Sequence, residues 1–270
     1  MRVHDALAEA ARRFGFSKTP RLDAELLMAH ALGVTREALL LGRLDDPAPA
    51  GFAALAERRA GHEPVAYITG SRAFWTIELA VGPGVLVPRA DTETLMEAAV
   101  DHFGARSPRT VLDLGTGSGA LLLAALDQWP EASGVGVDRS PEALAVARDN
   151  ARRLGMEERA RFVQGGWDAG GGEHDLVLCN PPYIAETEEP TREVADYEPA
   201  SALYAGRDGL DDYRALAPVI ARRIASGGIA CVEIGSRQGE SAAALFRAEG
   251  LTVAVRRDLG GRDRCLAATP

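Results

Sequence analysis

Short apolar runs alternate with amphipathic segments from residue 110 onward, and this alternation constrains the fold more than any other feature. Residues 110–114 form an apolar run that is followed by helical spacing over 120–129, and the pair recurs at 134–137 and 141–153. Strands separated by helices favour parallel pairing, because each helix carries the chain back across the sheet. We therefore predict an α/β fold with a doubly wound, mostly parallel sheet. Further strands are expected at 161–163, 176–179 and 228–234, a helix at 211–224, and a closing hairpin at 251–257 and 264–268.

The beginning of the chain has the pattern of several short helices. Thr19 followed by Pro20 is typical of a helix start, Thr35 is expected to cap another helix, and a further helix is expected over 52–59. Apolar residues then alternate around glycines, which favours a β-hairpin. We predict three parts: a helical bundle at 1–63, a β-hairpin linker at 64–87, and the α/β domain at 88–270, which opens with a helix over 88–104.

The charge distribution restricts the classes of partner. The net charge is −9, with 10 basic and 9 acidic residues up to position 75 and 20 basic and 30 acidic residues after it. Proteins that bind nucleic acids usually present a basic surface to the phosphates, so we expect no direct nucleic-acid partner. Charged residues interrupt every apolar run before the roughly 18 residues of a membrane span, so we expect no membrane association.

The cysteines bear on the cellular compartment and on metal binding. The chain has three, Cys179, Cys231 and Cys265, an odd and widely spaced set. This spacing argues against a disulfide framework and against a zinc site. We expect a cytoplasmic protein with reduced thiols and no metal.

A glycine-rich loop joins the first strand of the α/β domain to its helix. Gly115, Gly117 and Gly119 permit a tight turn and close approach of a ligand, and the helix start behind them offers free N–H groups. Asp138 follows at the end of the next strand, where a carboxylate can accept hydrogen bonds from both hydroxyls of a ribose. These features fit either a nucleotide-dependent dehydrogenase or a methyltransferase that uses S-adenosylmethionine (SAM).

Two details of the loop favour SAM. The spacing Gly-x-Gly-x-Gly is tighter than the fingerprint that binds a pyrophosphate. Asp113 directly precedes the loop, where its carboxylate would repel phosphates but would suit an ammonium and a sulfonium.

The sequence Asn180-Pro181-Pro182-Tyr183 follows the strand expected at 176–179. The prolines lack N–H groups and fix φ, which leaves rigid carbonyl acceptors, while the tyrosine offers a flat face to a planar group. Such a set suits methylation of a planar NH₂ group, whose lone pair is delocalised. The Asn180 side-chain oxygen and the Pro181 carbonyl can accept both N–H bonds and so direct the lone pair toward a methyl donor.

Together these motifs resemble the class I SAM-dependent methyltransferases that act on exocyclic or amide nitrogen. Further segments are similar to the peptide chain release factor glutamine methyltransferases, and the resemblance extends over the whole chain. They are Arg21–Leu27, the set Pro64, Tyr67, Gly70 and Phe74, Pro88–Glu93, Glu198-Pro199, Asp208–Leu210, Glu233–Gly235 and Asp263-Arg264.

The resemblance implies an enzyme that methylates N5 of the glutamine in the Gly-Gly-Gln tip of class-1 release factors. It also implies a seven-stranded methyltransferase domain and a helical bundle that docks the substrate protein. It also implies the site residues. The loop residues Gly115, Thr116, Gly117, Ser118 and Gly119 would line the methionine part of SAM, Asp138 would hold the ribose, and Trp167 would lie along the adenine. Asn180 would bridge cofactor and substrate, and the glutamine amide would be held by Asn180, Pro181, Pro182 and Tyr183, with Asn180, Pro181 and Tyr183 as the catalytic set.

Several points stay open at this level. Arg89 and Glu93 are expected either to shape the glutamine pocket or to form an ion pair, and residues 186–198 are expected to be a lid, a partner-facing loop or a solvated loop. Adenine-N6 nucleic-acid methyltransferases share the Asn-Pro-Pro-Tyr motif and are the alternative enzyme class. A non-catalytic module that binds SAM or a release factor is the alternative outside enzymes.

Overall fold

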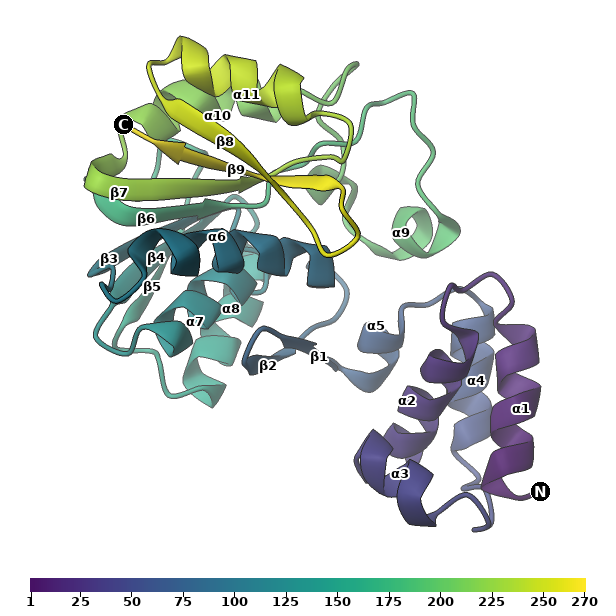
Figure 1. Cartoon of the computed structure of the whole chain (residues 1–270). Coiled ribbons are helices and arrows are strands. Elements are labelled where there is room, and N and C mark those ends of the chain that lie inside the picture. The colour runs from purple at the N-terminus through teal and green to yellow at the C-terminus, as the bar shows by residue number, and fades with distance from the viewer. The chain divides into compact units, whose positions relative to one another are not determined.

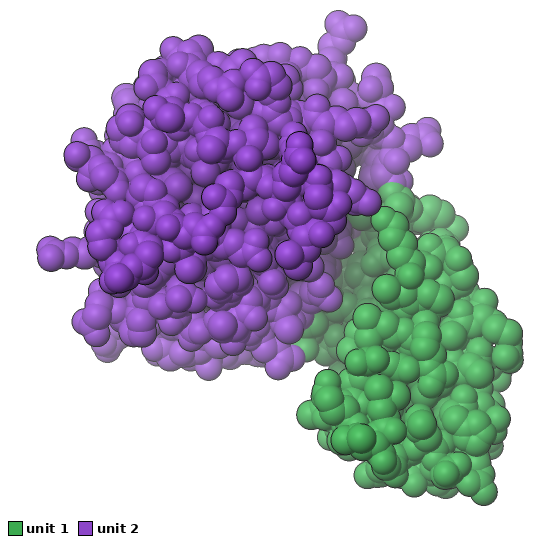
Figure 2. All heavy atoms as spheres, viewed as in Figure 1, with its two compact units in different colours: residues 1–71, 191–197 green, residues 72–190, 198–270 purple.

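The computed structural model describes all 270 residues, and the chain divides into two compact units. Unit 1 comprises residues 1–71 and 191–197, and unit 2 comprises residues 72–190 and 198–270 (Figure 2). A segment far along the sequence therefore belongs to the N-terminal unit. None of the helices has the length and apolar composition that a membrane span requires.

Unit 1 is a helical bundle. Its core is formed by fully buried side chains, among them Leu7, Phe14 and Leu27. The Thr35 hydroxyl accepts a hydrogen bond from the Ala38 N–H, which confirms the expected cap. The Thr19 hydroxyl instead donates to the Asp23 carboxylate, so this helix start has no side-chain cap. The helices are α1 (Val3–Arg13), α2 (Pro20–Leu32), α3 (Arg36–Gly42), α4 (Phe52–Ala60), α5 (Val65–Thr69) and α9 (Arg192–Tyr197).

The hairpin is shorter than the sequence indicated. It consists of β1 (Ser71–Phe74) and β2 (Ile77–Ala80), whereas residues 65–69 form α5. Pro64 stands at the N-cap of this helix and Gly70, in the left-handed conformation, ends it. Proline before and glycine after a short apolar segment favour one helical turn over a strand.

Unit 2 contains a seven-stranded sheet with the order β5-β4-β3-β6-β7-β9-β8 (Figure 1). All pairs are parallel except those of β9, which runs antiparallel to β7 and to β8. The predicted fold class is therefore confirmed. The strands are β3 (Thr110–Leu114), β4 (Ser133–Asp138), β5 (Ala160–Gln164), β6 (His174–Cys179), β7 (Ile224–Glu233), β8 (Thr252–Arg257) and β9 (Asp263–Thr269).

Helices cover both faces of this sheet (Figure 1). One face carries α6 (Glu93–Phe103), α7 (Ala120–Gln128) and α8 (Pro141–Arg153); the other carries α10 (Asp211–Ala221) and α11 (Gly239–Ala248). On the second face Tyr213 and Phe246 are fully buried against the strands. Two short 3₁₀ turns, η1 (Ala90–Thr92) and η2 (Ala200–Ala202), complete the unit.

Two helix boundaries differ from the sequence expectation. The helix expected from residue 88 starts at Glu93, after η1, and the helix expected to end at 224 stops at Ala221. Strand β7 takes over from Ile224, which pairs with His174 beyond an irregularity in the register. Pairing with a distant strand thus decides where the helix ends.

The strand order places the motifs at one edge. From β3 the chain proceeds to β4 and β5 on one side and to β6 and β7 on the other, so the order reverses beside β3. Ligands bind to open α/β sheets outside the carboxyl ends of the strands at such a reversal. The glycine loop follows β3, Asp138 ends β4, and Asn180 follows β6.

Candidate active site

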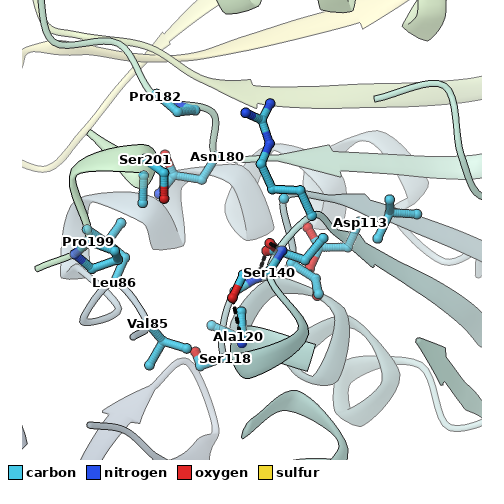
Figure 3. Close-up of a pocket in the computed structure, with 18 of the residues that line it drawn as sticks. Val85, Leu86, Asp113, Ser118, Ala120, Ser140, Asn180, Pro182, Pro199 and Ser201 are labelled. Carbon is cyan, nitrogen blue, oxygen red and sulfur yellow. Dashed lines mark hydrogen bonds between the residues drawn. The ribbon is translucent and has the colours of Figure 1, made fainter. Parts of the chain in front are cut away.

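A cavity opens at the carboxyl edge of the sheet in unit 2, and most of the predicted site residues line it (Figure 3). In this view Asn180 and Pro182 lie toward one end and Ser118 and Ala120 toward the other. Gly119, Pro181 and Tyr183 do not line it. The predicted residues in its wall are Gly115, Thr116, Gly117, Ser118, Asp138, Trp167, Asn180 and Pro182.

The glycine loop has the backbone conformation that its composition predicts. Gly115, Gly117 and Gly119 all have positive φ, at 75°, 55° and 85°. Gly119 is the N-cap of α7, and a Cβ there would lie 3.0 Å from Leu123 and 3.4 Å from Ala147. Gly119 therefore serves the packing of helices, whereas Gly115 and Gly117 face the cavity.

Asp138 holds the loop through its carboxylate. One oxygen accepts the Gly117 N–H at 2.9 Å and the other accepts the Ser140 N–H at 2.9 Å. The residue is half-buried and lines the cavity. Each oxygen retains a lone pair, so Asp138 can accept further hydrogen bonds from a diol.

Asp113 is buried beneath the loop with an incomplete set of partners. Its Oδ2 accepts the Thr116 hydroxyl at 2.6 Å and the Leu122 N–H at 3.2 Å, but its Oδ1 has no partner. Burial raises the pKa of Asp113 to about 7, and the nearby charge of Asp138 adds to the shift. A buried oxygen without a partner, in the wall of a cavity, suits a cationic group of a ligand.

Trp167 forms another part of the wall. Its Nε1–H donates to Asp212 Oδ1 at 3.0 Å, and the Arg139 guanidinium lies 5.8 Å from its ring centroid. Asp212 and Arg139 also line the cavity, and the sequence analysis missed both. The available signals were that Arg139 directly follows Asp138 and that Asp212 lies at the start of α10.

In the Asn-Pro-Pro-Tyr motif only alternate residues face the cavity. Asn180 lines it, and its Nδ2 lies 3.5 Å from the Thr92 hydroxyl oxygen. The Tyr183 hydroxyl donates to Glu233 Oε1 at 3.3 Å, and burial raises the pKa of this phenol. The Tyr183 hydroxyl is therefore bonded to Glu233, and the residue does not line the cavity, which differs from the expected contact with the glutamine amide.

The remaining wall comes from segments that the motifs do not include. Phe74, Val85, Leu86 and Pro88 contribute from the hairpin and the chain that follows it. The segment around η2 contributes Pro199, Ser201, Ala202 and Tyr204.

A partly buried ion pair connects these two segments within unit 2. Arg89 donates to both carboxylate oxygens of Glu198, at 2.7 and 2.6 Å, and the Glu198 side chain is fully buried. Glu93 instead accepts the Trp75 N–H, so an Arg89–Glu93 pair is not present. No local sequence pattern predicts a pair across 109 positions.

Residues 186–198 do not form one free loop. Thr191–Tyr197 belong to unit 1, where Glu193 accepts from Arg59 at 3.0 Å and the Tyr197 hydroxyl donates to the Gly61 carbonyl at 2.9 Å. These contacts fix α9 to the helical bundle.

Replacing Gly115 with alanine is expected to weaken SAM binding about tenfold, measured by calorimetry, because positive φ and a crowded Cβ together cost roughly 1–2 kcal/mol. The new Cβ would lie 3.2 Å from the Trp167 ring. The matched control is Gly33→Ala, since Gly33 has φ of 64° but no atom within 4 Å of its Cβ position. Equal SAM affinity in the two variants would contradict a binding role for Gly115.

Family models and solved structures match parts of this chain. Residues 5–70 match the model of the PrmC N-terminal domain, and residues 89–196 match that of the methyltransferase small domain. Solved structures with similar folds include a methyltransferase from Pyrococcus furiosus (TM-score 0.54, 15% identity, 80% of this chain and 98% of that one). Another is a ribosomal protein L11 methylase from Lactobacillus delbrueckii (TM-score 0.50, 20% identity, 70% and 83%).

Curated relatives match over nearly the whole chain. A release factor glutamine methyltransferase from Rhodospirillum rubrum is 45% identical, with 92% of this chain and 78% of the relative covered. The enzyme of the same name from Moorella thermoacetica is 41% identical over 99% and 98% of the two chains. The match to the relative from Moorella thermoacetica, at 99% of this chain, spans both family-model regions. The chain belongs to the release factor glutamine methyltransferase family.

Proposed function

We propose that the protein transfers a methyl group from SAM to the side-chain amide nitrogen of the glutamine in the Gly-Gly-Gln motif of class-1 release factors. The observation that carries this proposal is that Asn180 lines the same cavity as the glycine loop and Asp138. A side chain whose oxygen can accept a hydrogen bond from a substrate amide thus lies in the cavity that has the features of a SAM site. The relatives named above are called release factor glutamine methyltransferases, which supports a release factor glutamine as the substrate.

The chemistry of the cavity fits SAM. The unpartnered Asp113 Oδ1 suits its ammonium, Asp138 suits its ribose, and Trp167 offers a flat surface to its adenine. Gly115 allows close approach of the ligand because it has no Cβ. SAM, when bound, supplies a methyl group on a sulfonium.

The residues of the motif would then prepare the substrate. The Asn180 Oδ1, on a residue that lines the cavity, would take one N–H bond of the glutamine amide, and the Pro181 carbonyl, which does not line the cavity here, would have to turn toward it to take the other. This arrangement points the nitrogen lone pair at the methyl carbon and stabilises the positive charge that develops on nitrogen. The N–C bond forms as the C–S bond breaks, and the nitrogen afterwards loses one proton to water.

The affinity for SAM is expected to rise with pH toward about 7 and then to level off. Asp113 has its pKa raised to about 7 by burial, so it is neutral below that value and ionised above it. A cationic ligand prefers the ionised form, so affinity should fall by up to about tenfold for each pH unit below 7.

Calorimetry between about pH 5.5 and 7.5 measures this dependence. The range lies below the pH at which the α-amino group of SAM loses its proton, so the charge of the ligand stays constant. Asp113→Asn has no charge to titrate, so its affinity should be lower and nearly constant over the same range. A steep dependence that persists in Asp113→Asn would contradict the assignment.

The substrate is tested with labelled SAM and three acceptors in parallel: a class-1 release factor, the same factor with its Gly-Gly-Gln glutamine replaced by alanine, and duplex DNA. Label only in the intact release factor supports the proposal. Label in DNA alone would establish the adenine-N6 alternative, and binding of SAM without transfer to any acceptor would indicate a non-catalytic module.

We further propose roles for the three parts of the chain. Residues 1–63 would dock the release factor, residues 64–87 would link the parts, and residues 88–270 would carry out transfer in the cytoplasm without a metal. An antibody fragment raised against unit 1 would cover this docking surface. Its binding should block methylation of the whole release factor and leave methylation of a short Gly-Gly-Gln peptide unchanged.

A further inference from the structure

Asp212 lies in the cavity wall and has one carboxylate oxygen that no other residue of the protein uses. It is the second residue of α10 and lines the same cavity as Trp167. Its Oδ1 accepts the Trp167 indole N–H at 3.0 Å, whereas its Oδ2 has no hydrogen-bond or salt-bridge partner. The buried side-chain atoms without a partner belong to Asp113, His174 and Glu233, so the free oxygen of Asp212 is accessible to a ligand.

The bond to the indole determines which part of a ligand can reach this oxygen. The Trp167 Nε1–H points outward from the edge of the ring, so the carboxylate that accepts it lies beside that edge. The Arg139 guanidinium lies 5.8 Å from the ring centroid and forms no salt bridge with Asp212, so it leaves the oxygen free. A negatively charged acceptor therefore lies at the edge of a flat aromatic surface in the cavity wall.

The chemistry of the free oxygen selects one kind of ligand edge. An ionised carboxylate only accepts hydrogen bonds, so it requires a donor. A planar base that lies along the indole presents its own edge to Asp212. The edge of adenine carries one exocyclic donor, the 6-amino group, whereas hypoxanthine carries an acceptor oxygen at the same place. This part of the wall therefore suits adenine and disfavours hypoxanthine.

We infer that Asp212 is a specificity-determining residue for the base of the methyl donor. Its Oδ1 holds the Trp167 indole, and its Oδ2 accepts a hydrogen bond from the adenine 6-amino group. The inference rests on the proposed function, in which adenine lies along Trp167. In that proposal the glycine loop and Asp138 contact other parts of SAM, so Asp212 supplies the contact that distinguishes one base from another.

The first test measures the binding of S-adenosylhomocysteine and of S-inosylhomocysteine by calorimetry, which requires no methyl acceptor. The wild type should bind the adenine compound at least about tenfold more tightly, the effect of one hydrogen bond to a charged group. In Asp212→Asn the amide oxygen must accept the Trp167 N–H, because the reverse orientation would bring two donors together. The amide NH₂ then faces the base and suits the oxygen of hypoxanthine, so the preference for adenine should vanish or reverse.

The matched control for this test is Asp211→Asn. Asp211 carries the same charge on the same helix, pairs with Arg214 at 2.7 Å and does not line the cavity, so this variant should keep the wild-type preference. A wild type without a preference for adenine, an unchanged preference in Asp212→Asn, or the same change in Asp211→Asn would overturn the inference alone. A wild type that binds neither compound would overturn the proposed function as well, and one that binds SAM without methylating a release factor would overturn only the proposed function.

The second test examines the contact between Asp212 and the indole. The chain has three tryptophans, so an NMR spectrum of the indole N–H groups contains three signals, and that of Trp167 is identified by its loss in Trp167→Phe. Asp212→Leu removes the acceptor, so the Trp167 signal should shift and its hydrogen should exchange with solvent about tenfold faster. The Trp75 indole, which donates to Gln128 at 3.1 Å, should be unaffected and so reports that the fold is intact. A Trp167 signal that is unchanged in Asp212→Leu would overturn the inference.

Discussion

Replacement of Asn180 with alanine is expected to lower kcat for release-factor methylation about 100-fold, the usual effect of one polar group that stabilises a transition state. The variant removes the acceptor oxygen in the cavity wall and leaves the glycine loop, Asp113 and Asp138 untouched. SAM affinity should stay within several-fold of the wild type. Single-turnover rates and SAM titrations on the same preparation measure the two quantities separately.

The chain contains one other asparagine, which provides the contrast. Asn150 is buried on α8 and bonds to the backbone of Ala80 and Ser118 through three hydrogen bonds. Asn150→Ala is expected to lower stability and SAM affinity, because it releases the loop at Ser118. If Asn180→Ala also lost SAM affinity to the same extent, or kept its full turnover, Asn180 would have no specific part in the transfer step.

The parts of the fold that sequence alone predicted are those specified by local signals. The helix α8 has the expected bounds, and the Ser140 hydroxyl caps it by accepting the Ala143 N–H. The closing hairpin forms as the antiparallel pair β8–β9. Apolar periodicity, capping residues and glycine all act within a few positions, which is why a single sequence shows them.

The site residues that sequence did not reveal depend on pairs distant in the chain. Thr92 contacts Asn180 across 88 positions, and Trp167 contacts Asp212 across 45. Such pairs follow from strand order and helix packing, which a local pattern does not specify. The glycine loop was found because its conformation requires glycine, whereas an acidic residue such as Asp212 is compatible with many surroundings.

Replacement of Arg59 with alanine is expected to destabilise unit 1 by about 3–5 kcal/mol, since it leaves a buried carboxylate without its partner. The Arg59 side chain is 3% exposed and donates to Asp23 at 2.9 Å, to Glu193 at 3.0 Å and to the Glu63 carbonyl at 3.0 Å. Its guanidinium also lies 4.9 Å from the Phe16 ring centroid. Hydrogen exchange at the amides of α2 and α4 measures the loss within unit 1.

The neighbouring arginine offers a matched control. Arg58 pairs with Glu63 on an exposed surface, with 44% of its side chain accessible, so Arg58→Ala should cost less than about 1 kcal/mol. The double variant Asp23→Asn, Arg59→Met should recover much of the lost protection, because no buried charge remains unpaired. Equal loss in Arg58→Ala and Arg59→Ala would show that the buried pair makes no special contribution.

The same variant also examines the docking role proposed for the helical bundle. Glu193 lies on α9, which belongs to unit 1, and Arg59 is one of the residues that fix this helix there. Loss of order in the bundle should therefore raise KM for the whole release factor while SAM affinity stays unchanged. A short Gly-Gly-Gln peptide, which has no surface for the bundle, should be methylated equally by Arg59→Ala and Arg58→Ala; a matching loss with the peptide would place the effect in unit 2 instead.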